Sequence, residues 1–248
     1  MLIFYVRHGD PIYVPDQLTP LGKRQAESVA KRLALYGIDE VYSSTSTRAM
    51  QTAEPTCEIT KNELHTLEWA HEKHAFKDFA LPYGDGEKKT WIFSHPDYNN
   101  FLVSREVREL GYKWYEHPRL AEFHLEQGIE RVRREAYDWM SSLGYEYDRE
   151  TGLYKITAEN PDKRVALFAH EGFGKVFLSV LLDIPYPSFA SHFEMKHSGV
   201  TVISLDDSGK FDTRGYARAR VMTLSNDSHL YRDGLPTDHI STGIRVKY

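Results

Sequence analysis

Residues Met1–Pro11 read MLIFYVRHGDP. The run from Leu2 to Val6 is apolar and rich in residues that favour β-structure, which predicts a strand buried on both faces of a sheet. Arg7 and His8 follow this strand directly, just ahead of a Gly-Asp-Pro turn. A charged pair at that position indicates either a surface loop or the start of an active site.

The residues after this strand alternate helix and strand. Thr19 is a good helix N-cap, Pro20 suits the first helical position and Gly37 can end the helix, so a helix is predicted here. Residues 38–44 predict a second strand, and residues 45–60 predict a second helix that begins at a Ser/Thr cluster. Strand, helix, strand and helix in this order predict a parallel sheet with right-handed crossovers.

The second half of the chain repeats this pattern. The predicted elements are a helix over 126–143 ended by Gly144, a hairpin over 144–156 turned at Glu150-Thr151-Gly152, a buried strand over 164–169 followed by His170, a helix over 175–183, and two strands within 199–225 around an Asp207-Ser208-Gly209 turn. We therefore expect an α/β fold in which a single domain spans residues 1–248.

Residues 69–118 do not fit this pattern. They include three of the four tryptophans, Trp69, Trp91 and Trp114, and a PYGDGEKK loop without clear periodicity. The segment can be an aromatic-lined cap over a pocket, a dimerisation surface, or a peripheral helical subdomain whose aromatic residues pack against one another. We favour the cap and expect 69–118 to be an insertion in the domain.

The composition argues against several classes of protein. The net charge of −5, without any lysine or arginine run, gives no footprint for nucleic acid, so an anionic substrate needs a local positive pocket. Cys57 is the only cysteine, which excludes an intramolecular disulfide and a cysteine metal cluster. No stretch resembles a signal peptide or a membrane span. We expect a cytoplasmic protein that binds neither nucleic acid nor membranes. The sequence is compatible with a homo-oligomer and does not decide the oligomeric state.

Four residues share a similar context in the sequence. Arg7 and His8 end the first strand, Arg48 lies in the first turn of the helix after the second strand, and His170 follows a buried strand. Ligands of parallel α/β sheets bind outside the carboxyl ends of the strands. Arginine offers a permanently charged, planar fork suited to phosphate, and a neutral imidazole can attack phosphorus. The pattern predicts a site for a phosphoryl group.

Four motifs, VRHGD, LTPLGKRQAE, VYSSTSTRAMQTAEP and LFAHEG, occur in this order. Together they resemble the histidine phosphatase superfamily, the phosphoglycerate-mutase-like proteins. The resemblance is close over about the first 65 residues and resumes from about residue 120 to the end of HSGVTVISLD. It implies a three-layer sandwich around a mainly parallel sheet and a phosphohistidine intermediate, with no metal and no other cofactor.

The resemblance also implies roles for these residues. His8 matches the nucleophile of the family, and Arg7 and Arg48 match the arginines that clamp the phosphate. His170 matches the second histidine, which bonds the phosphoryl group and stabilises the transition state. All four are therefore expected to bind phosphate.

The proton donor to the leaving oxygen is less defined. Members of this branch carry a glutamate after the second helix, and the stretch LHTLEWAHE offers Glu68, which we favour. Glu72 is a neighbouring candidate, and Glu171 is a third because a more distant branch places its acid directly after the second histidine. A general acid contributes about 10²–10⁴-fold to the rate.

The sequence departs from the family pattern in three places. Glu171 stands where the family often has a glycine, which puts a carboxylate close to an anion site. The loop after His8 lacks an asparagine often found there, and Tyr13 is a candidate substitute. Residues 69–118 do not resemble the insert of true mutases.

His71 and His74 have one-turn spacing, but no third ligand is evident, so no metal site is predicted.

The function predicted from these observations is hydrolysis of a small phosphorylated metabolite by a phosphatase that forms phosphohistidine on His8. One alternative is a phosphomutase of the phosphoglycerate-mutase type. A second is a catalytically weak protein that binds phosphorylated ligands or acts as a scaffold, with the aromatic segment as its docking surface.

Overall fold

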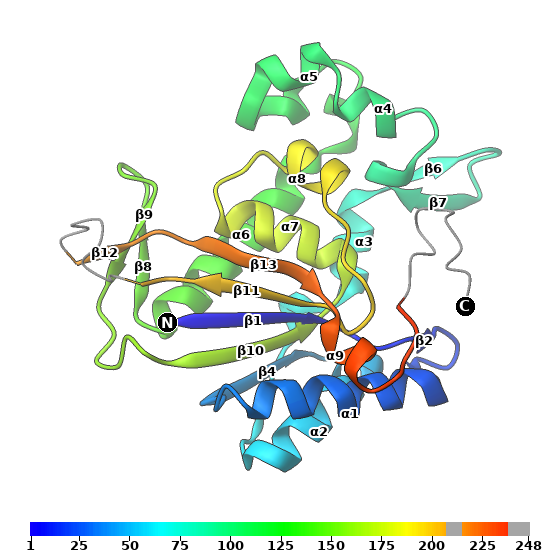
Figure 1. Ribbon diagram of the computed structural model, residues 1–248. Coiled ribbons are helices and arrows are strands. Elements are labelled where there is room, and N and C mark those ends of the chain that lie inside the picture. Colours follow the sequence, from blue (N-terminus) through cyan, green and yellow to red (C-terminus); the bar gives the residue numbers. More distant parts are fainter. Residues whose placement is uncertain (207–214, 238–248) are drawn as a thin grey trace.

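The computed structural model describes residues 1–206 and 215–237 of the chain. Its centre is a six-stranded sheet (Figure 1), with the strand order β13 (Arg220–Asn226), β11 (Val200–Ser204), β1 (Leu2–Arg7), β10 (Arg164–Ala169), β4 (Glu40–Ser44) and β5 (Leu64–Leu67). The four strands from β1 to β5 in this order are parallel, whereas β11 is antiparallel to both β1 and β13. The predicted α/β fold with a mainly parallel sheet is confirmed.

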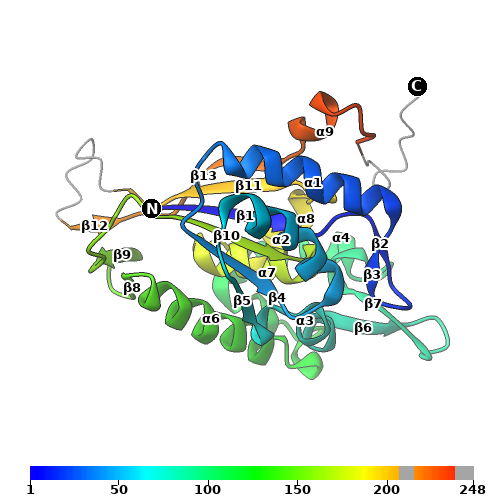
Figure 2. The ribbon, with the colours of Figure 1, turned by 90° about the horizontal axis from the view of Figure 1, so that it is seen from below.

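Helices cover both faces of the sheet, which gives three layers (Figures 1 and 2). On one face lie α1 (Pro20–Ala34) and α2 (Thr47–Thr60). On the other lie α6 (Leu125–Ser142) and α7 (Glu171–Leu181), with α3 (Glu72–Phe79) packed against both of them. The sandwich architecture expected from the resemblance is therefore present.

Smaller elements surround these layers. The remaining helices are α4 (Asn99–Leu102), α5 (Arg105–Leu110), α8 (Tyr186–His192) and α9 (Ser228–Arg232), with short 3₁₀ helices at Glu68–Ala70, Ile92–Ser94, Gly111–Glu116 and Ala121–Phe123. The remaining strands are β2 (Pro11–Ile12), β3 (Gln17–Leu18), β6 (Ala80–Tyr83), β7 (Lys88–Trp91), β8 (Tyr145–Asp148), β9 (Leu153–Ile156) and β12 (Tyr216–Ala217).

The first strand is buried on both faces, as predicted. Ile3 and Tyr5 pack in the hydrophobic cluster on the α6–α7 side, and Phe4 and Val6 pack in the cluster on the α1–α2 side. All four side chains are 0% exposed. Because successive side chains of a strand point to opposite faces, one apolar run supplies two cores. At the carboxyl end of β1 the chain leaves the sheet, and Arg7 and His8 lie at this point.

The predicted helices form with small changes at their ends. Thr19 caps α1 by accepting a hydrogen bond from the Gly22 amide, and Gly37 lies just beyond the helix with a positive φ of 69°. The hairpin of β8 and β9 also forms as predicted, whereas the Asp207-Ser208-Gly209 turn lies outside the described residues.

Helix α7 begins at Glu171, directly after His170, and not at residue 175 as predicted. The stretch Glu-Gly-Phe-Gly has low helix propensity, which hid this start in the sequence. Tertiary packing explains the glycines. A Cβ on Gly174 would lie 2.6 Å from the Tyr5 hydroxyl, and one on Gly172 would lie 2.3 Å from the Trp91 ring.

Two glycines bring the start of α1 against the loop that follows His8. A Cβ on Gly9 would lie 2.6 Å from the carbonyl oxygen of Gly22, and a Cβ on Gly22 would lie 2.2 Å from that of Asp10. Neither position has room for a larger residue. The backbone beside His8 is therefore held against the first turn of α1.

Residues 69–118 form α3, the β6–β7 hairpin, α4, α5 and two of the 3₁₀ helices. In Figure 1 these elements lie on the α6–α7 side of the sheet and at the edge toward which β1 and β10 point. Trp114 packs in the core cluster on that side, with the partly buried Trp69 and Trp91 against it. Among the helices of the described residues, none is both long and apolar enough to span a membrane.

Candidate active site

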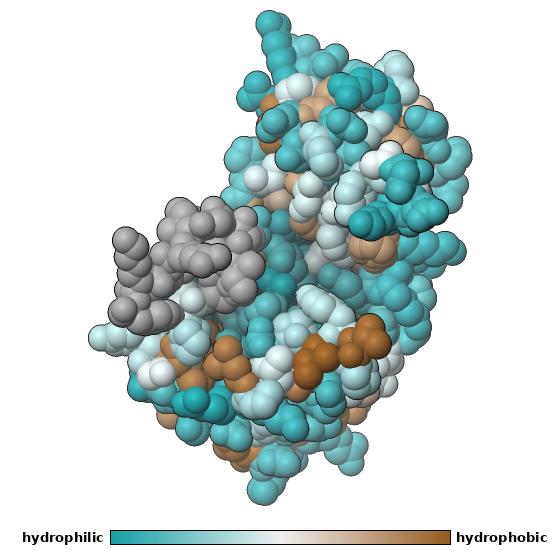
Figure 3. Space-filling model, turned by 90° about the vertical axis from the view of Figure 1, so that its right-hand side faces the viewer, coloured by the Kyte–Doolittle hydropathy of each residue, from teal (hydrophilic) through white to brown (hydrophobic). Residues whose placement is uncertain are grey.

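A pocket opens at the carboxyl ends of the central strands. Figure 3 looks onto this face of the molecule, which is hollowed and lined mainly by hydrophilic residues. The volume of the pocket is ≈ 660 Å³, within the range of about 300–1,000 Å³ typical of small-molecule sites. The lining residues are Arg7, His8, Tyr13, Arg48, His71, Glu72, Lys73, Phe76, Trp91, Phe93, Ser94, Glu171, Gly172 and Glu194.

His8 is held as a neutral imidazole with a defined tautomer. Its Nδ1 lies 2.7 Å from the Gly9 carbonyl oxygen. A carbonyl only accepts hydrogen bonds, so Nδ1 carries the proton and Nε2 keeps a free lone pair. Burial lowers the pKa of His8 well below its usual value, and His170, Arg7 and Arg48 lower it further. The lone pair is therefore available at neutral and mildly acidic pH.

Arg48 is fixed by three neighbours. Its Nη1 donates to Asp16 at 2.6 Å, its Nη2 lies 3.1 Å from His170 Nδ1, and its guanidinium lies 5.3 Å from the centre of the Tyr13 ring. Asp16 also accepts hydrogen bonds from the Ser46 hydroxyl and the Thr47 amide at the start of α2. Asp16 therefore ties the guanidinium to the start of its own helix.

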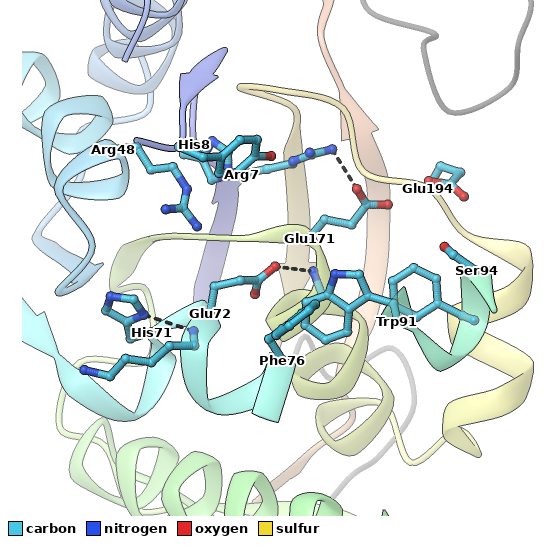
Figure 4. A pocket seen from close by; sticks show the side chains of 14 residues that line it. Arg7, His8, Arg48, His71, Glu72, Phe76, Trp91, Ser94, Glu171 and Glu194 are labelled. Atoms are coloured by element: carbon cyan, nitrogen blue, oxygen red, sulfur yellow. Dashed lines mark hydrogen bonds and ion pairs between the residues drawn. The ribbon is translucent and has the colours of Figure 1, made fainter. Parts of the chain in front are cut away.

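Arg7 extends from the end of β1 along the pocket to Glu171 (Figure 4). Its Nη1 lies 2.8 Å from the Glu171 carboxylate and also donates to the Met195 carbonyl. The Nε atoms of Arg7 and Arg48 are buried and have no hydrogen-bond partner among the described residues. Both arginines thus keep donor capacity beside His8 for an anion.

His170 lies beside His8, with a distance of 5.2 Å between the ring centres. Arg48 must donate to Nδ1 of His170, so the proton of the neutral ring is on Nε2 and points to the Ser44 hydroxyl at 2.8 Å. The Tyr5 hydroxyl donates to the His170 carbonyl at 2.6 Å and accepts from its amide at 3.3 Å. The first strand thus supports the backbone of the second histidine. The structure brings together all four residues of the predicted phosphate site.

The structure separates Glu68, the favoured proton donor, from this pocket. Glu68 is exposed and contacts Thr45, Lys73 and His74. Hydrogen bonds from Lys73, Thr45 and His74 lower the pKa of Glu68 to about 2. A carboxylate with this pKa carries no proton at neutral pH, and Glu68 is not among the described residues that line the pocket.

Glu72 lies inside the pocket instead (Figure 4). It is the first residue of α3, and its carboxylate accepts hydrogen bonds from the amides of Gly172 at 3.0 Å and Phe173 at 2.8 Å. Burial raises the pKa of Glu72 to about 7, although these two hydrogen bonds and the nearby arginines favour the charged form. A carboxyl group with this pKa can both donate and accept a proton at neutral pH.

Glu171 has a different environment. It contacts Arg7 on one side and Lys175 Nζ on the other, at 3.3 Å. Burial acts to raise the pKa of Glu171, but the Arg7 charge and the hydrogen bonds of the group outweigh burial and hold the pKa below its usual value. Glu171 is therefore a charged partner of Arg7 and not a proton donor at neutral pH.

Sequence reasoning did not identify several residues of the site. Asp16 lies in a short loop without periodicity, and the aromatic side chains of Phe76, Trp91 and Phe93 could not be assigned to the pocket. His71 was given no role in chemistry, yet it lines the pocket with its ring 6.0 Å from that of His170. Its position directly after the 3₁₀ turn that follows β5 was the available signal.

The donor set of the pocket is suited to an anion. Within residues 1–206 and 215–237, no group of three or more His, Cys, Asp or Glu side chains is arranged to hold a metal ion. The basic groups Arg7, Arg48, His8 and Lys73 gather on the pocket wall. The arrangement can bind a phosphoryl group next to a histidine with a free Nε2.

Replacing Asp16 by alanine is expected to weaken the binding of inorganic phosphate or vanadate by about ten- to a hundredfold, because a charge-assisted hydrogen bond is worth about 1.5–3 kcal/mol. Asp16→Asn keeps an oxygen for Arg48 and should retain most of the affinity. Isothermal titration of the wild type and both variants measures the effect. Equal affinity of the wild type and Asp16→Ala, with unchanged thermal stability, would show that Asp16 does not position Arg48.

Comparisons with known proteins concern the sequence motifs and the fold. Residues 3–80 match the model of the histidine phosphatase superfamily (branch 1). The search of curated proteins gave no match. Among solved structures, a phosphoserine phosphatase mutant from Entamoeba histolytica is 18% identical with a TM-score of 0.57, over 92% of this chain and 98% of that one.

Two further structures show the same fold. A mycobacterial glucosyl-3-phosphoglycerate phosphatase is 18% identical with a TM-score of 0.55, over 90% of this chain and 98% of that one. The α-ribazole phosphatase from Shigella flexneri is 16% identical with a TM-score of 0.55, over 92% and 97%. At these identities the structures establish the fold. The predicted resemblance to the histidine phosphatase superfamily is thus confirmed, in the motifs of residues 3–80 and in the phosphoglycerate-mutase-like fold of the chain.

Proposed function

We propose that this protein is a phosphatase that hydrolyses a small phosphomonoester through a phosphohistidine intermediate on His8. The observation that carries the proposal is the hydrogen bond from His8 Nδ1 to the Gly9 carbonyl, which leaves Nε2 unprotonated inside a pocket with two arginines. The structural neighbours, each described as a phosphatase, support hydrolysis as the reaction class.

The first step is attack of His8 Nε2 on phosphorus. The new N–P bond forms while the bond from phosphorus to the leaving oxygen breaks, and Arg7 and Arg48 stabilise the charge on the non-bridging oxygens. His170 is proposed to donate from Nε2 to the same phosphoryl group. This requires the Nε2–H to exchange the Ser44 hydroxyl for a phosphoryl oxygen, while Nδ1 keeps its hydrogen bond from Arg48.

Glu72, and not Glu68, is proposed to protonate the leaving oxygen. The carboxyl group of Glu72 lies in the pocket and has a pKa of about 7, whereas Glu68 is ionised and outside it. Glu72 is a carboxylate after the first step and accepts a proton from water as the water attacks phosphorus. Inorganic phosphate leaves, and the lone pair of His8 is restored.

Residues 69–118 are proposed to act as a cap within a single domain. α3 contributes Glu72, Lys73 and Phe76 to the pocket, and the stretch from Trp91 to Ser94 closes another side. This supports the interpretation of the segment as an aromatic-lined cap. It would exclude water from the leaving group while His8 reacts.

Rapid quenching with a ³²P-labelled substrate tests the mechanism. The expected result is a transient label on the protein that is stable in alkali, labile in acid and located on His8. Free phosphate should accumulate with each turnover, whereas return of phosphate to a second hydroxyl would indicate a mutase. Tight binding of phosphorylated ligands without turnover of a broad panel would favour the scaffold alternative.

A further inference from the structure

The pocket has a second end, away from Arg48, that the phosphoryl chemistry does not use. Figure 4 shows Glu171 and Glu194 at this end, with Trp91 and Ser94 beside them. Arg7 lies between the two ends, because its guanidinium belongs to the phosphate clamp and contacts Glu171 at 2.8 Å. A phosphomonoester bound at His8 therefore extends its alcohol portion toward two carboxylates.

The cation that holds these carboxylates lies behind them. Lys175 Nζ is 3.3 Å from Glu171 and 3.6 Å from Glu194, its side chain is 1% exposed, and it lies 4.0 Å from the centre of the Phe93 ring. Lys175 is not among the residues that line the pocket, whereas both glutamates are. The groups that a ligand meets at this acidic end are therefore the two carboxylates and the Arg7 guanidinium that contacts Glu171.

The carboxyl groups of Glu171 and Glu194 also influence each other's protonation. Partial burial and the neighbouring Glu171 raise the pKa of Glu194 to about 7, so Glu194 is partly protonated near neutral pH. Its side chain is 54% exposed, which leaves it accessible to a ligand. Arg7 from β1 and Lys175 from α7 face the pair, and their positive charges favour the ionised carboxylates.

The remaining wall is aromatic. Trp91 stacks on Phe93 with 5.5 Å between ring centres, and Phe76 meets Trp91 edge-on at 5.2 Å. Gly172 leaves room for the Trp91 indole at the start of α7. Aromatic rings attract cations and reduce the local dielectric, which strengthens an ion pair at this position.

We propose that Glu171 and Glu194 bind a protonated amine on the alcohol portion of the substrate, so that the substrates are phosphomonoesters of amino alcohols. The inference rests on the proposed phosphatase function, because it assumes that the phosphoryl group lies at His8. The ammonium group contacts both carboxylates, which requires Glu194 to be ionised. Binding therefore releases a proton near neutral pH, and affinity rises as the pH increases toward and through 7.

A matched pair of ligands isolates the charge. O-Phosphoethanolamine and n-propyl phosphate have similar size and differ in the terminal ammonium or methyl group. Isothermal titration with the His8→Ala protein measures binding of both without turnover. We expect O-phosphoethanolamine to bind about tenfold more tightly at pH 7, which corresponds to one partly desolvated ion pair. Titration in buffers of different ionisation enthalpy should show proton release for the amine alone.

Glu194→Gln in the otherwise wild-type protein tests the residue. Its kcat/KM for O-phosphoethanolamine should fall to about that for n-propyl phosphate, while the value for n-propyl phosphate should stay within about twofold. Glu122→Gln, an exposed glutamate outside the pocket, controls for the loss of one negative charge. In this control the preference for the amine should be unchanged.

Two outcomes would overturn the proposal. Equal binding of the two ligands, or a preference for glycerol phosphate over both, would show that the acidic end does not select an ammonium group. Failure of the phosphatase proposal would give a different result. In that case O-phosphoethanolamine would still bind His8→Ala more tightly than n-propyl phosphate, but the wild type would hydrolyse none of the three compounds.

Discussion

Replacing His8 by alanine is expected to lower kcat/KM for a phosphomonoester at least about 10³-fold, because the proposed nucleophile of the covalent step is removed. The protein label trapped by rapid quenching should disappear. Binding of inorganic phosphate or vanadate should persist, since Arg7 and Arg48 remain in the pocket. Initial rates with a substrate panel, together with phosphate titrations, measure both effects.

His192→Ala is a matched control for this result. His192 lies at the end of α8 on the surface, outside the residues that line the pocket. Its replacement should leave kcat/KM within about twofold, as is usual for surface substitutions. A His8→Ala protein that keeps its fold and more than a tenth of the wild-type activity would rule out His8 as the nucleophile.

Replacing Glu72 by glutamine is expected to lower kcat for an alkyl phosphate by about 10²–10⁴-fold, the usual contribution of a general acid. The loss should be much smaller with 4-nitrophenyl phosphate, because the nitrophenolate leaves without a proton. Glutamine can still accept a hydrogen bond from the α7 amides. Comparison of the two substrates therefore separates proton donation from a structural defect.

The pH profile gives a second readout for Glu72. The pKa of about 7 is raised above the usual value for a glutamate, so the protonated acid is present below pH 7 and lost above it. His8 stays neutral well below pH 6.5, because its pKa is lowered. The wild-type rate with alkyl phosphates should thus fall as the pH rises through about 7. Glu72→Gln should lack this fall.

Glu68→Gln is the matched variant for Glu72. Glu68 is ionised and contacts Thr45, Lys73 and His74 outside the pocket. Its replacement should change kcat for alkyl phosphates by less than about threefold, as expected of a surface carboxylate. A large loss in Glu68→Gln together with an active Glu72→Gln would return the role of proton donor to Glu68, as predicted from the sequence.

The clustering of Arg7, His8, Arg48 and His170 at one edge of the sheet could be predicted because strand topology places these residues there. A buried run such as Leu2–Val6 predicts a central strand, and the residues that follow parallel strands meet at one edge of the sheet. Arg7, His8 and His170 were located in this way, and Arg48 by its position in the first turn of α2. Within helices and strands, the position of a residue in the sequence therefore predicts its position in the fold closely.

The choice between Glu68 and Glu72 could not be made from the sequence. Strand β5 ends at Leu67, and a single 3₁₀ turn separates it from α3. The directions of the side chains in and after such a short turn cannot be predicted from the periodicity of apolar residues. This turn places Glu68 on the surface and aims Glu72 at the amides of α7. Contacts of this kind depend on tertiary structure.

The acidic end of the pocket was hidden for a related reason. Glu194 follows α8 in a segment without regular structure, and it meets Glu171 only through the fold. The departure at Glu171 was visible in the sequence as a carboxylate near an anion site. Its partners Lys175 and Glu194 became apparent only in three dimensions.

The segment from Glu72 to Ser94 supplies both the carboxyl group proposed to protonate the leaving oxygen and the aromatic wall around the alcohol portion. Selection for a new substrate would act on this wall, and any change that moves α3 would also move Glu72, the proposed proton donor. Exchange of residues 72–94 between related proteins would therefore change the alcohol portion that is accepted and the protonation of the leaving oxygen together. Single substitutions at Phe76 or Phe93, which leave Glu72 on its amides, offer the gradual route by which such an enzyme changes its substrate.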